Sequence, residues 1–244
     1  MKIICSDYDG TLNHGGITDE KLSAIRKWQE NGNLFAVVSG RQADFYYELK
    51  KKGIPVDFLL ACNGAVITDK DYNIISSSIC EEDIGNELTE FLFSLGCPFV
   101  YFNGKESLRI KNKDFPEEEG TDYDPSKKLL DFNQISTAHD TFRKAAFVTE
   151  RVREKFGELL NPLQNGTCID VVPAGIDKAE GIHILLRSLG LGAESVIAVG
   201  DNVNDEAMIG EFYSYAMANG VDSIKELADN ITVSIEELIE REMH

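Results

Sequence analysis

Short apolar runs alternate with helical patterns near both ends of the chain. Between residues 1 and 62, the runs KIICS, LFAVVS and DFLLAC are separated by predicted helices over 18–32 and 43–53. Thr18 is a candidate N-cap for the first helix, and Gly32 a candidate stop. This rhythm predicts a parallel sheet with right-handed crossovers. The strands are apolar along their whole length, as expected when both faces of a sheet are covered.

The pattern changes in the middle of the chain. A hairpin is predicted over 65–79, with its turn at 69–72. Beyond Cys80 we expect helices at 82–96 and 150–160, an acidic loop at 112–125, and apolar strand candidates at 99–102, 107–111, 145–149 and 167–172. Paired strands mixed with helices indicate a separate α+β unit.

The first rhythm then returns and continues to the end of the chain. Helices are predicted at 178–190, 204–211, 222–229 and 235–244, and strands at 195–200, 213–218 and 231–234. The sequence therefore predicts an α/β, Rossmann-like parallel-sheet domain made of residues 1–80 and 172–244. An α+β domain of residues 81–171 interrupts it.

The chain is strongly acidic, with 42 Asp and Glu against 24 Lys and Arg and a formal net charge of −18. That field repels nucleic acid and anionic membranes, so we expect neither as a partner. A phosphorylated small molecule would be repelled as well unless the protein offers it a local cationic site. The expected partner is a small phosphorylated metabolite, and the oligomeric state is left open.

The five cysteines are scattered and form no C-x-x-C pair. They are expected to be small buried apolar residues in a reducing compartment. The N-terminus has no apolar run of signal-peptide length before its first acidic residues, and no run is long enough to cross a bilayer. These features predict a cytoplasmic protein.

Polar residues stand just after four of the predicted strands. The residues are Asp7 and Asp9; Ser39, Gly40 and Arg41; Asn63 and Gly64; and Gly200, Asp201, Asn202, Asn204 and Asp205. Any one of these groups is explained by turn formation alone. In an open parallel sheet, however, ligands bind beyond the carboxyl ends of the strands, so the four groups together predict a site.

Carboxylates gathered at one place need a cation among them. Mg²⁺ prefers oxygen ligands and is typically held by one or two carboxylates together with substrate phosphate. Asp7, Asp201 and Asp205, with the backbone carbonyl of Asp9, are the candidate ligands. Such an ion would also neutralise an approaching phosphate.

The same residues support covalent phosphoryl transfer. One carboxylate can attack phosphorus, and a second can donate a proton to the leaving oxygen and later accept one from water. Asp7 and Asp9 are two apart, which places both side chains on one side of an extended backbone. The Ser39 hydroxyl and the backbone amides of Gly10, Thr11 and Gly40 are candidate phosphate contacts. Lys178, at the start of a predicted helix, is the candidate cation.

Four motifs in this order resemble the haloacid dehalogenase (HAD) superfamily of phosphohydrolases. They are DYDGT (Asp7 to Thr11), VVSGR with Ser39, GIDKAEGI with Lys178, and VGDNVND with Asp201 and Asp205. A large insert between the second and third motifs, preceded by CNGA and followed by DVVPAGIDKAEG, resembles the Cof-type subclass with a type-two (IIB) cap. Ala-Glu follows the lysine where that family more often has Gly-x-Ala.

The resemblance implies a role for each matching residue. Asp7 would be the nucleophile and Asp9 the general acid and base, with Ser39, Gly40 and Asn204 at the phosphate. Lys178 would steady both Asp7 and the phosphate. Mg²⁺ would be held by Asp7, the Asp9 carbonyl and Asp201, with Asp205 in or behind the ligand set. Arg41 and Asn63 are candidate substrate contacts.

Three functions are weighed. The favoured one is a magnesium-dependent phosphatase of a small phosphorylated metabolite, and the expected substrate is a sugar phosphate. A phosphotransferase of the phosphomannomutase kind shares the motifs and the cap type. The third is a non-enzymatic phosphoaspartyl or metal-binding module, against which the proposed acid at Asp9 and the large insert both argue.

Overall fold

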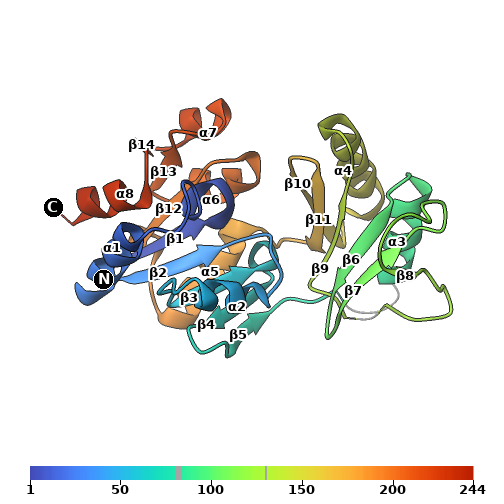
Figure 1. Ribbon diagram of the computed structural model, residues 1–244, viewed down its shortest axis with the longest axis horizontal. Coiled ribbons are helices and arrows are strands. Elements are labelled where there is room, and N and C mark those ends of the chain that lie inside the picture. Colours follow the sequence, from blue (N-terminus) through green and yellow to red (C-terminus); the bar gives the residue numbers. More distant parts are fainter. Residues whose placement is uncertain (81–83, 130, 244) are drawn as a thin grey trace. The chain divides into compact units, whose positions relative to one another are not determined.

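The computed structural model describes residues 1–80, 84–129 and 131–243. The chain divides into two compact units, Met1–Ser76 with Lys178–His244, and Ser77–Asp177 (Figure 1). The boundaries predicted from the sequence, after residues 80 and 171, fall inside the second unit. One reason is that strand β11 (Cys168–Pro173) pairs along its length with β10 (Leu160–Asn165), which ties residues 172 and 173 to the second sheet.

The first unit is built on one sheet whose strand order is β14-β13-β12-β1-β2-β3-β4-β5. Neighbours from β14 to β3 run parallel, and β4 returns antiparallel to β3. This arrangement confirms the predicted parallel sheet. Strands β4 and β5 are neighbours at the edge of the sheet, which confirms the hairpin predicted over 65–79. The strands are β1 (Ile3–Asp7), β2 (Leu34–Val38), β3 (Phe58–Ala61), β4 (Val66–Asp69), β5 (Ile74–Ser77), β12 (Val196–Gly200), β13 (Ser214–Met217) and β14 (Asn230–Thr232).

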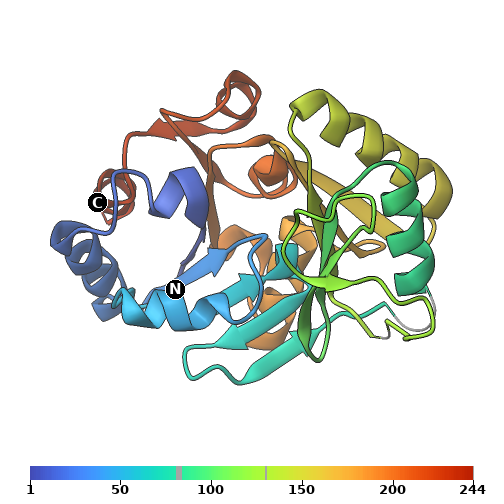
Figure 2. The same cartoon turned by 45° about the vertical axis from the view of Figure 1, so that its right-hand side comes forward.

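Helices pack on this sheet because each carries an apolar stripe. Residues of α5, α6 and α7 share one buried cluster with alternate residues of the central strands, whereas α1 contacts β2 and α8 (Figure 2). The hydroxyl of Thr18 accepts a hydrogen bond from the Lys21 amide, so Thr18 is the N-cap of α1. The helices are α1 (Asp19–Glu30), α2 (Phe45–Lys51), α5 (Lys178–Leu189), α6 (Glu206–Glu211), α7 (Asp222–Leu227) and α8 (Ile235–Glu242).

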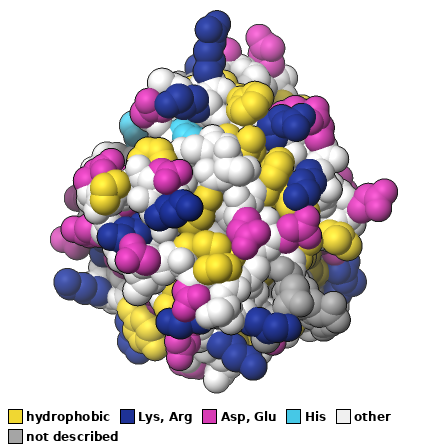
Figure 3. Space-filling view, turned by 90° about the vertical axis from the view of Figure 1, so that its right-hand side faces the viewer, with side chains coloured by type: hydrophobic (Ala, Val, Ile, Leu, Met, Phe, Trp, Pro, Cys, Tyr) yellow, Lys and Arg dark blue, Asp and Glu magenta, His cyan; other side chains and the backbone are white. Residues whose placement is uncertain are grey.

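The second unit has its own sheet, in the order β10-β11-β9-β6-β7-β8. Helices α3 (Ile84–Ser94) and α4 (Phe142–Phe156) cover one face, where their apolar residues form a cluster with those of the strands. The remaining strands are β6 (Phe99–Asn103), β7 (Ser107–Lys111), β8 (Thr121–Asp122) and β9 (Gln134–Ala138). In the view of Figure 3, acidic and basic side chains are interspersed with hydrophobic ones over the visible surface.

Several predictions in this unit are wrong. Residues 145–149 are not a strand: Thr141 caps α4, and Ala145, Val148 and Val152 continue its buried stripe at helical spacing. The predicted helix at 150–160 ends at Phe156, and Leu160 already belongs to β10. Strands β9 and β10 were not predicted, because their sequences, QISTA and LNPLQN, contain too few apolar residues to form an apolar run. The acidic loop contains the short β8, and the predicted start of the first helix at residues 82 and 83 lies outside the described residues.

Four of the five cysteines are buried as predicted, and the prediction is wrong for the fifth. Cys5, Cys62, Cys80 and Cys97 are buried, whereas Cys168 is exposed at the first position of β11. No helix within the described part of the chain is both long and apolar enough to cross a membrane.

Candidate active site

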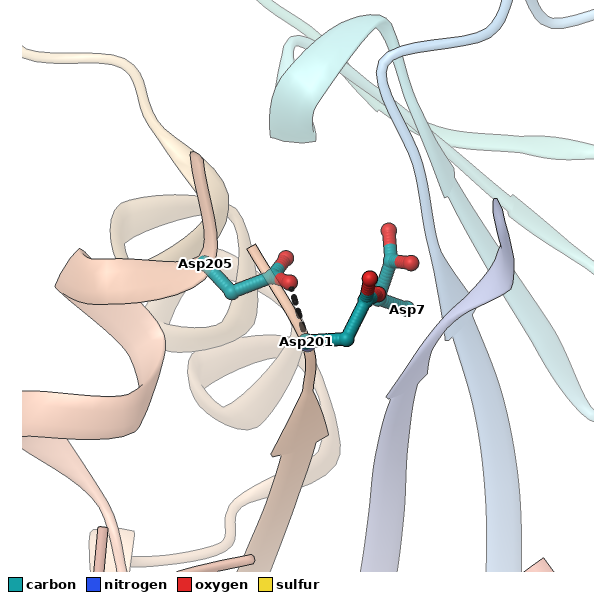
Figure 4. A group of neighbouring side chains, drawn as sticks. All are labelled: Asp7, Asp201 and Asp205. Atoms are coloured by element: carbon teal, nitrogen blue, oxygen red, sulfur yellow. Dashed lines mark hydrogen bonds between the residues drawn. The ribbon is translucent and has the colours of Figure 1, made fainter. Parts of the chain in front are cut away.

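Three carboxylates from two parts of the chain meet at the carboxyl ends of β1 and β12. Asp7 is the last residue of β1, Asp201 directly follows β12, and Asp205 ends a short turn, η4 (Val203–Asp205). The two strands pair in parallel, with Ser6 opposite Val199, so their ends adjoin. One carboxylate oxygen of each residue lies within 4.8 Å of the others (Figure 4). The predicted convergence of Asp7, Asp201 and Asp205 is thus present in the structure.

Lys178 supplies the cation within this group. Its Nζ lies 2.6 Å from Oδ1 of Asp7 and 2.5 Å from Oδ1 of Asp205, and its side chain is fully buried. The first turn of α5 therefore brings the ammonium to the ends of β1 and η4. Burial alone would lower the pKa of Lys178, but the carboxylates of Asp205 and Asp7 raise it overall. The lysine is charged at any physiological pH.

The ionisation of Asp7 is strongly perturbed. Its burial raises the pKa to about 8, with a smaller contribution from the charges of Asp205 and Asp201 and an opposing one from Lys178. Burial also raises the pKa of Asp201, although the hydroxyl of Thr11 donates to its Oδ1 at 2.7 Å. A single ammonium therefore leaves this group of carboxylates short of positive charge.

The hydrogen bonds divide the three carboxylates into two kinds. Asp205 is fully engaged: its Oδ1 accepts from Lys178, and its Oδ2 accepts from the backbone amides of Asp201 (2.9 Å) and Asn202 (3.1 Å). Among the described side chains, Lys178 alone donates to Asp7, at Oδ1, and Thr11 alone donates to Asp201, also at Oδ1. The second oxygens of Asp7 and Asp201 are thus available to a divalent cation, and Asp205 orients its neighbours.

This arrangement suits a hard divalent ion. Mg²⁺ binds oxygen at about 2.0–2.1 Å and is usually held by one or two carboxylates with waters and phosphate oxygens. Asp7 and Asp201 meet that requirement with one available oxygen each. The uncompensated negative charge around Lys178 would favour such an ion. The chemistry of the donor set therefore fits the predicted magnesium site.

The turn after β1, η1 (Tyr8–Leu12), packs closely against Asp201. Gly10 has a φ of 84°, and a Cβ at this position would lie 2.3 Å from Oδ2 of Asp201. The Gly10 carbonyl accepts from the side chain of Asn219 at 2.9 Å. Only glycine satisfies both the left-handed conformation and the close approach. This explains in physical terms why DYDGT has glycine at its fourth position.

Asp9 lies apart from the three clustered carboxylates. Its two oxygens accept from Nε and one terminal nitrogen of Arg41, both at 2.8 Å, and its side chain is about half exposed. Asp7 and Asp9 do not lie on one side of an extended strand as predicted, because β1 ends at Asp7 and the chain turns at Tyr8. Arg41 lies over the rings of Phe45 and Tyr8, which fix its guanidinium beside Asp9.

The other predicted residues follow the neighbouring strand ends. Val38 is opposite Asp7 across the β1–β2 ladder, so Ser39 comes next along the same edge. Ser39 is buried, and its hydroxyl accepts from the Arg41 amide at 3.2 Å. Asn63 is also buried and donates its backbone amide to the Ser39 carbonyl at 2.9 Å. Gly40 lies between Ser39 and Arg41, and Asn204 is partly buried in the same turn as Asp205.

Some residues around the site were not predicted. The Thr11 hydroxyl ties η1 to Asp201 after β12, and the side-chain amide of Asn219 ties it to the segment after β13. Lys52 donates to the hydroxyl of Tyr8 at 2.6 Å. Only Thr11 carries a sequence signal, as part of DYDGT, and there its backbone alone was considered. The other two depend on packing between segments far apart in sequence.

Comparisons with known proteins identify the family. A model of the haloacid dehalogenase-like hydrolases matches residues 4–238. The chain is 31% identical over 235 residues to 5-amino-6-(5-phospho-D-ribitylamino)uracil phosphatase YcsE of Bacillus subtilis, covering 95% of this chain and 90% of that protein. A second relative, YwtE, comes from the same organism and is named for the same phosphatase activity. It is 26% identical over 273 residues, covering 97% of this chain and 94% of YwtE.

Solved structures agree on the fold. The structure of the HAD subclass IIB sugar phosphatase BT4131 superposes with a TM-score of 0.80 at 18% identity, covering 100% of this chain and 99% of that one. The chain belongs to the haloacid dehalogenase-like hydrolase family. Within that family it is a Cof-type phosphatase with an inserted α+β cap domain, so the alternative of a non-enzymatic module is set aside.

Proposed function

We propose that this phosphatase is magnesium-dependent and hydrolyses the phosphate monoester of a small polyhydroxylated metabolite through an aspartyl-phosphate. The observation that carries the proposal is the setting of Asp7. It is a buried carboxylate with one oxygen bound to Lys178 and the other available beside Asp201. A nucleophile and a metal site thus share one residue.

The proposed ion is held by Asp7 and Asp201. Mg²⁺ at this position would neutralise the phosphate and add the positive charge that the site lacks. Asp205 keeps Lys178 and the backbone at Asp201 in place through its hydrogen bonds. The predicted contribution of the Asp9 backbone carbonyl stays a proposal.

In the first chemical step the Asp7 carboxylate attacks phosphorus, and the bond from phosphorus to the ester oxygen breaks. Asp9 gives its proton to that departing oxygen. In the second step Asp9 takes a proton from water, whose oxygen attacks the phosphorus of the aspartyl-phosphate. The bond from phosphorus to the Asp7 oxygen breaks, which restores the Asp7 carboxylate and releases inorganic phosphate. The two-point pair between Asp9 and Arg41 has to open for these proton transfers, because it engages both oxygens of Asp9.

The phosphoryl oxygens need donors in both steps. The Ser39 hydroxyl and the backbone amides of Gly10, Thr11 and Gly40 are the proposed donors, with Lys178 as the protein's cation and Asn204 as a further contact. Their places at adjoining strand ends support this assignment. Arg41 and Asn63 remain proposed contacts for the rest of the substrate.

The substrate class rests on the relatives. Two are named for a phosphorylated ribitylamino-uracil, and one solved structure is described as a sugar phosphatase. A phosphate ester on a hydroxylated carbon chain is the chemistry common to these names. We propose the same class for this chain, which includes the sugar phosphates predicted from the sequence.

The test is a phosphate-release assay with Mg²⁺ over sugar phosphates, sugar-alcohol phosphates, the phosphorylated ribitylamino-uracil, nucleotides and an aryl phosphate. We expect the highest kcat/KM in the hydroxylated-chain group. Conversion of a hexose phosphate to its isomer without phosphate release would favour the phosphotransferase instead. Absence of hydrolysis of every ester, the aryl phosphate included, would contradict the proposal.

Magnesium binding is expected to release a proton from Asp7. With its pKa raised to about 8, Asp7 is largely protonated at pH 6–7 in the metal-free protein, and the ion binds the carboxylate form. The Mg²⁺ affinity should therefore fall by up to about tenfold per pH unit below 8 and level off above it. Calorimetry in two buffers of different ionisation enthalpy measures the released proton.

The matched control for this measurement is Asp7→Asn, which has no proton to release at that position. Residual Mg²⁺ binding by this variant should show little dependence on pH between 6 and 9. An affinity of the wild-type protein that is unchanged over the same range would contradict the release of a proton from Asp7 when Mg²⁺ binds.

A further inference from the structure

Lys21 is a buried lysine whose ammonium is bound entirely by backbone carbonyls. Its Nζ donates to the carbonyl oxygens of Leu12 at 2.7 Å, His14 at 2.9 Å and Gly16 at 2.9 Å. The residue is only 3% exposed. An ammonium has three N–H donors, so all three are used and all three end on one loop.

The ammonium of Lys21 donates its hydrogen bonds to carbonyl dipoles and not to an acid. No ion pair within the described part of the chain includes Lys21, although the charge of Glu236 acts favourably on it. Burying an ammonium without a carboxylate is unfavourable unless several strong acceptors surround it. The three carbonyls thus form a cage of the kind that binds a monovalent cation, and the lysine supplies that cation covalently.

The loop that forms the cage continues the catalytic turn. Its backbone bonds run back into η1, with the amides of Asn13 and His14 donating to the carbonyls of Tyr8 and Thr11. Gly15 and Gly16 both have positive φ, and a Cβ on either would meet nothing within 4 Å. Since glycines restrict the backbone least, the loop needs an external group to hold one conformation.

The other end of the same segment touches the site. Thr11 donates to Asp201, and Gly10 is held by Asn219. Asp9, the proposed acid and base, lies between the nucleophile and these contacts. Lys21 therefore binds the end of the segment 8–16 that is remote from Asp201.

We propose that Lys21 is a positioning residue that acts as a built-in monovalent cation for the loop of residues 12–16. By gathering the three carbonyls, it holds the η1 turn so that Asp9 and Thr11 are correctly placed for the reaction. The part of this proposal that concerns catalysis rests on the proposed function. Its consequence is specific: without the lysine side chain, the empty cage should accept a small ammonium ion from solution.

The experiment compares Lys21→Ala with the wild-type protein, with and without added methylammonium. We expect kcat on an aryl phosphate to fall about 10²-fold, because a misplacement of about 1 Å has an effect of that size, with KM changed by less than about threefold. Methylammonium should raise the kcat of Lys21→Ala at least about threefold. Tetramethylammonium at equal ionic strength should not, because it has no N–H donor.

Trp28→Phe is the matched control for a merely structural effect. Trp28 lies in the same helix, is equally buried, and donates to a backbone carbonyl, that of Leu34, at 2.8 Å. This variant should lose thermal stability with kcat unchanged and no response to methylammonium. Equal losses of kcat in the two variants would overturn the proposal, as would an Ala variant with the wild-type kcat or one that methylammonium does not rescue.

Hydrogen exchange gives a readout that does not depend on activity. Amides of residues 8–17 should exchange at least about tenfold faster in Lys21→Ala than in wild type, and in Trp28→Phe at the wild-type rate. Unchanged exchange in Lys21→Ala would overturn the positioning role, whereas a wild-type protein without phosphatase activity would contradict only the proposed function. If Lys21→Ala does not fold, Lys21→Met, which keeps the apolar stem, serves for the kcat and hydrogen-exchange measurements.

Discussion

Replacing Asp7 by asparagine is expected to lower kcat by about 10⁴-fold or more with the fold intact, since loss of a covalent nucleophile has effects of that order. The amide cannot attack phosphorus, yet it fills the same space. Steady-state hydrolysis of an aryl phosphate, with circular dichroism and thermal unfolding as checks on folding, measures both expectations.

The control for this variant is Asp229→Asn. Asp229 is also a carboxylate of the first unit that accepts from a backbone amide, that of Ser214 at 2.9 Å, but it is not part of the three-carboxylate cluster. The kcat of Asp229→Asn should stay within about twofold of wild type.

Acid quenching of the wild-type enzyme during turnover should leave a phosphoryl group on the peptide that contains Asp7. A fully active Asp7→Asn enzyme would show that the nucleophile has been assigned wrongly.

Replacing Lys178 by methionine is expected to damage both activity and stability. Without the ammonium, Asp7 and Asp205 face each other inside the protein, and removing one partner of a buried charge pair typically costs about 3–5 kcal/mol. We expect that loss in urea unfolding at pH 9 with a chelator present, because Asp7, with its pKa raised to about 8, is ionised there in the wild-type protein. Added Mg²⁺ should recover part of it, because the ion restores positive charge to the carboxylates.

A double variant tests the reason for this loss. Asp7→Asn combined with Lys178→Met removes one of the two carboxylates left unpaired, so it should be more stable than Lys178→Met alone. Lys27→Met, at an exposed position of α1, controls for the loss of a lysine as such. Equal stability of the single and double variants would contradict a destabilisation that arises from charge.

Local patterns in the sequence determined the parallel sheet and the strand ends from which the site is built. Apolar runs predicted β1, β2, β3 and β12, and the polar residues after them predicted where Asp7, Ser39, Asn63 and Asp201 would stand. Such predictions succeed because the carboxyl ends of adjacent parallel strands share one edge of a sheet. In the second unit the same reasoning misplaced α4, since a short apolar run suits a buried helix as well as a strand.

Only the tertiary structure decided how the side chains at that edge are used. In the structure both oxygens of Asp205 accept hydrogen bonds, so Asp7 and Asp201 each keep one oxygen for the proposed metal ion, and Asp9 pairs with Arg41. The tertiary structure also directed the ammonium of Lys21 to three carbonyls of the loop that precedes it. Chain periodicity places backbones, but the partner of a buried charge depends on which segments the whole fold packs against it.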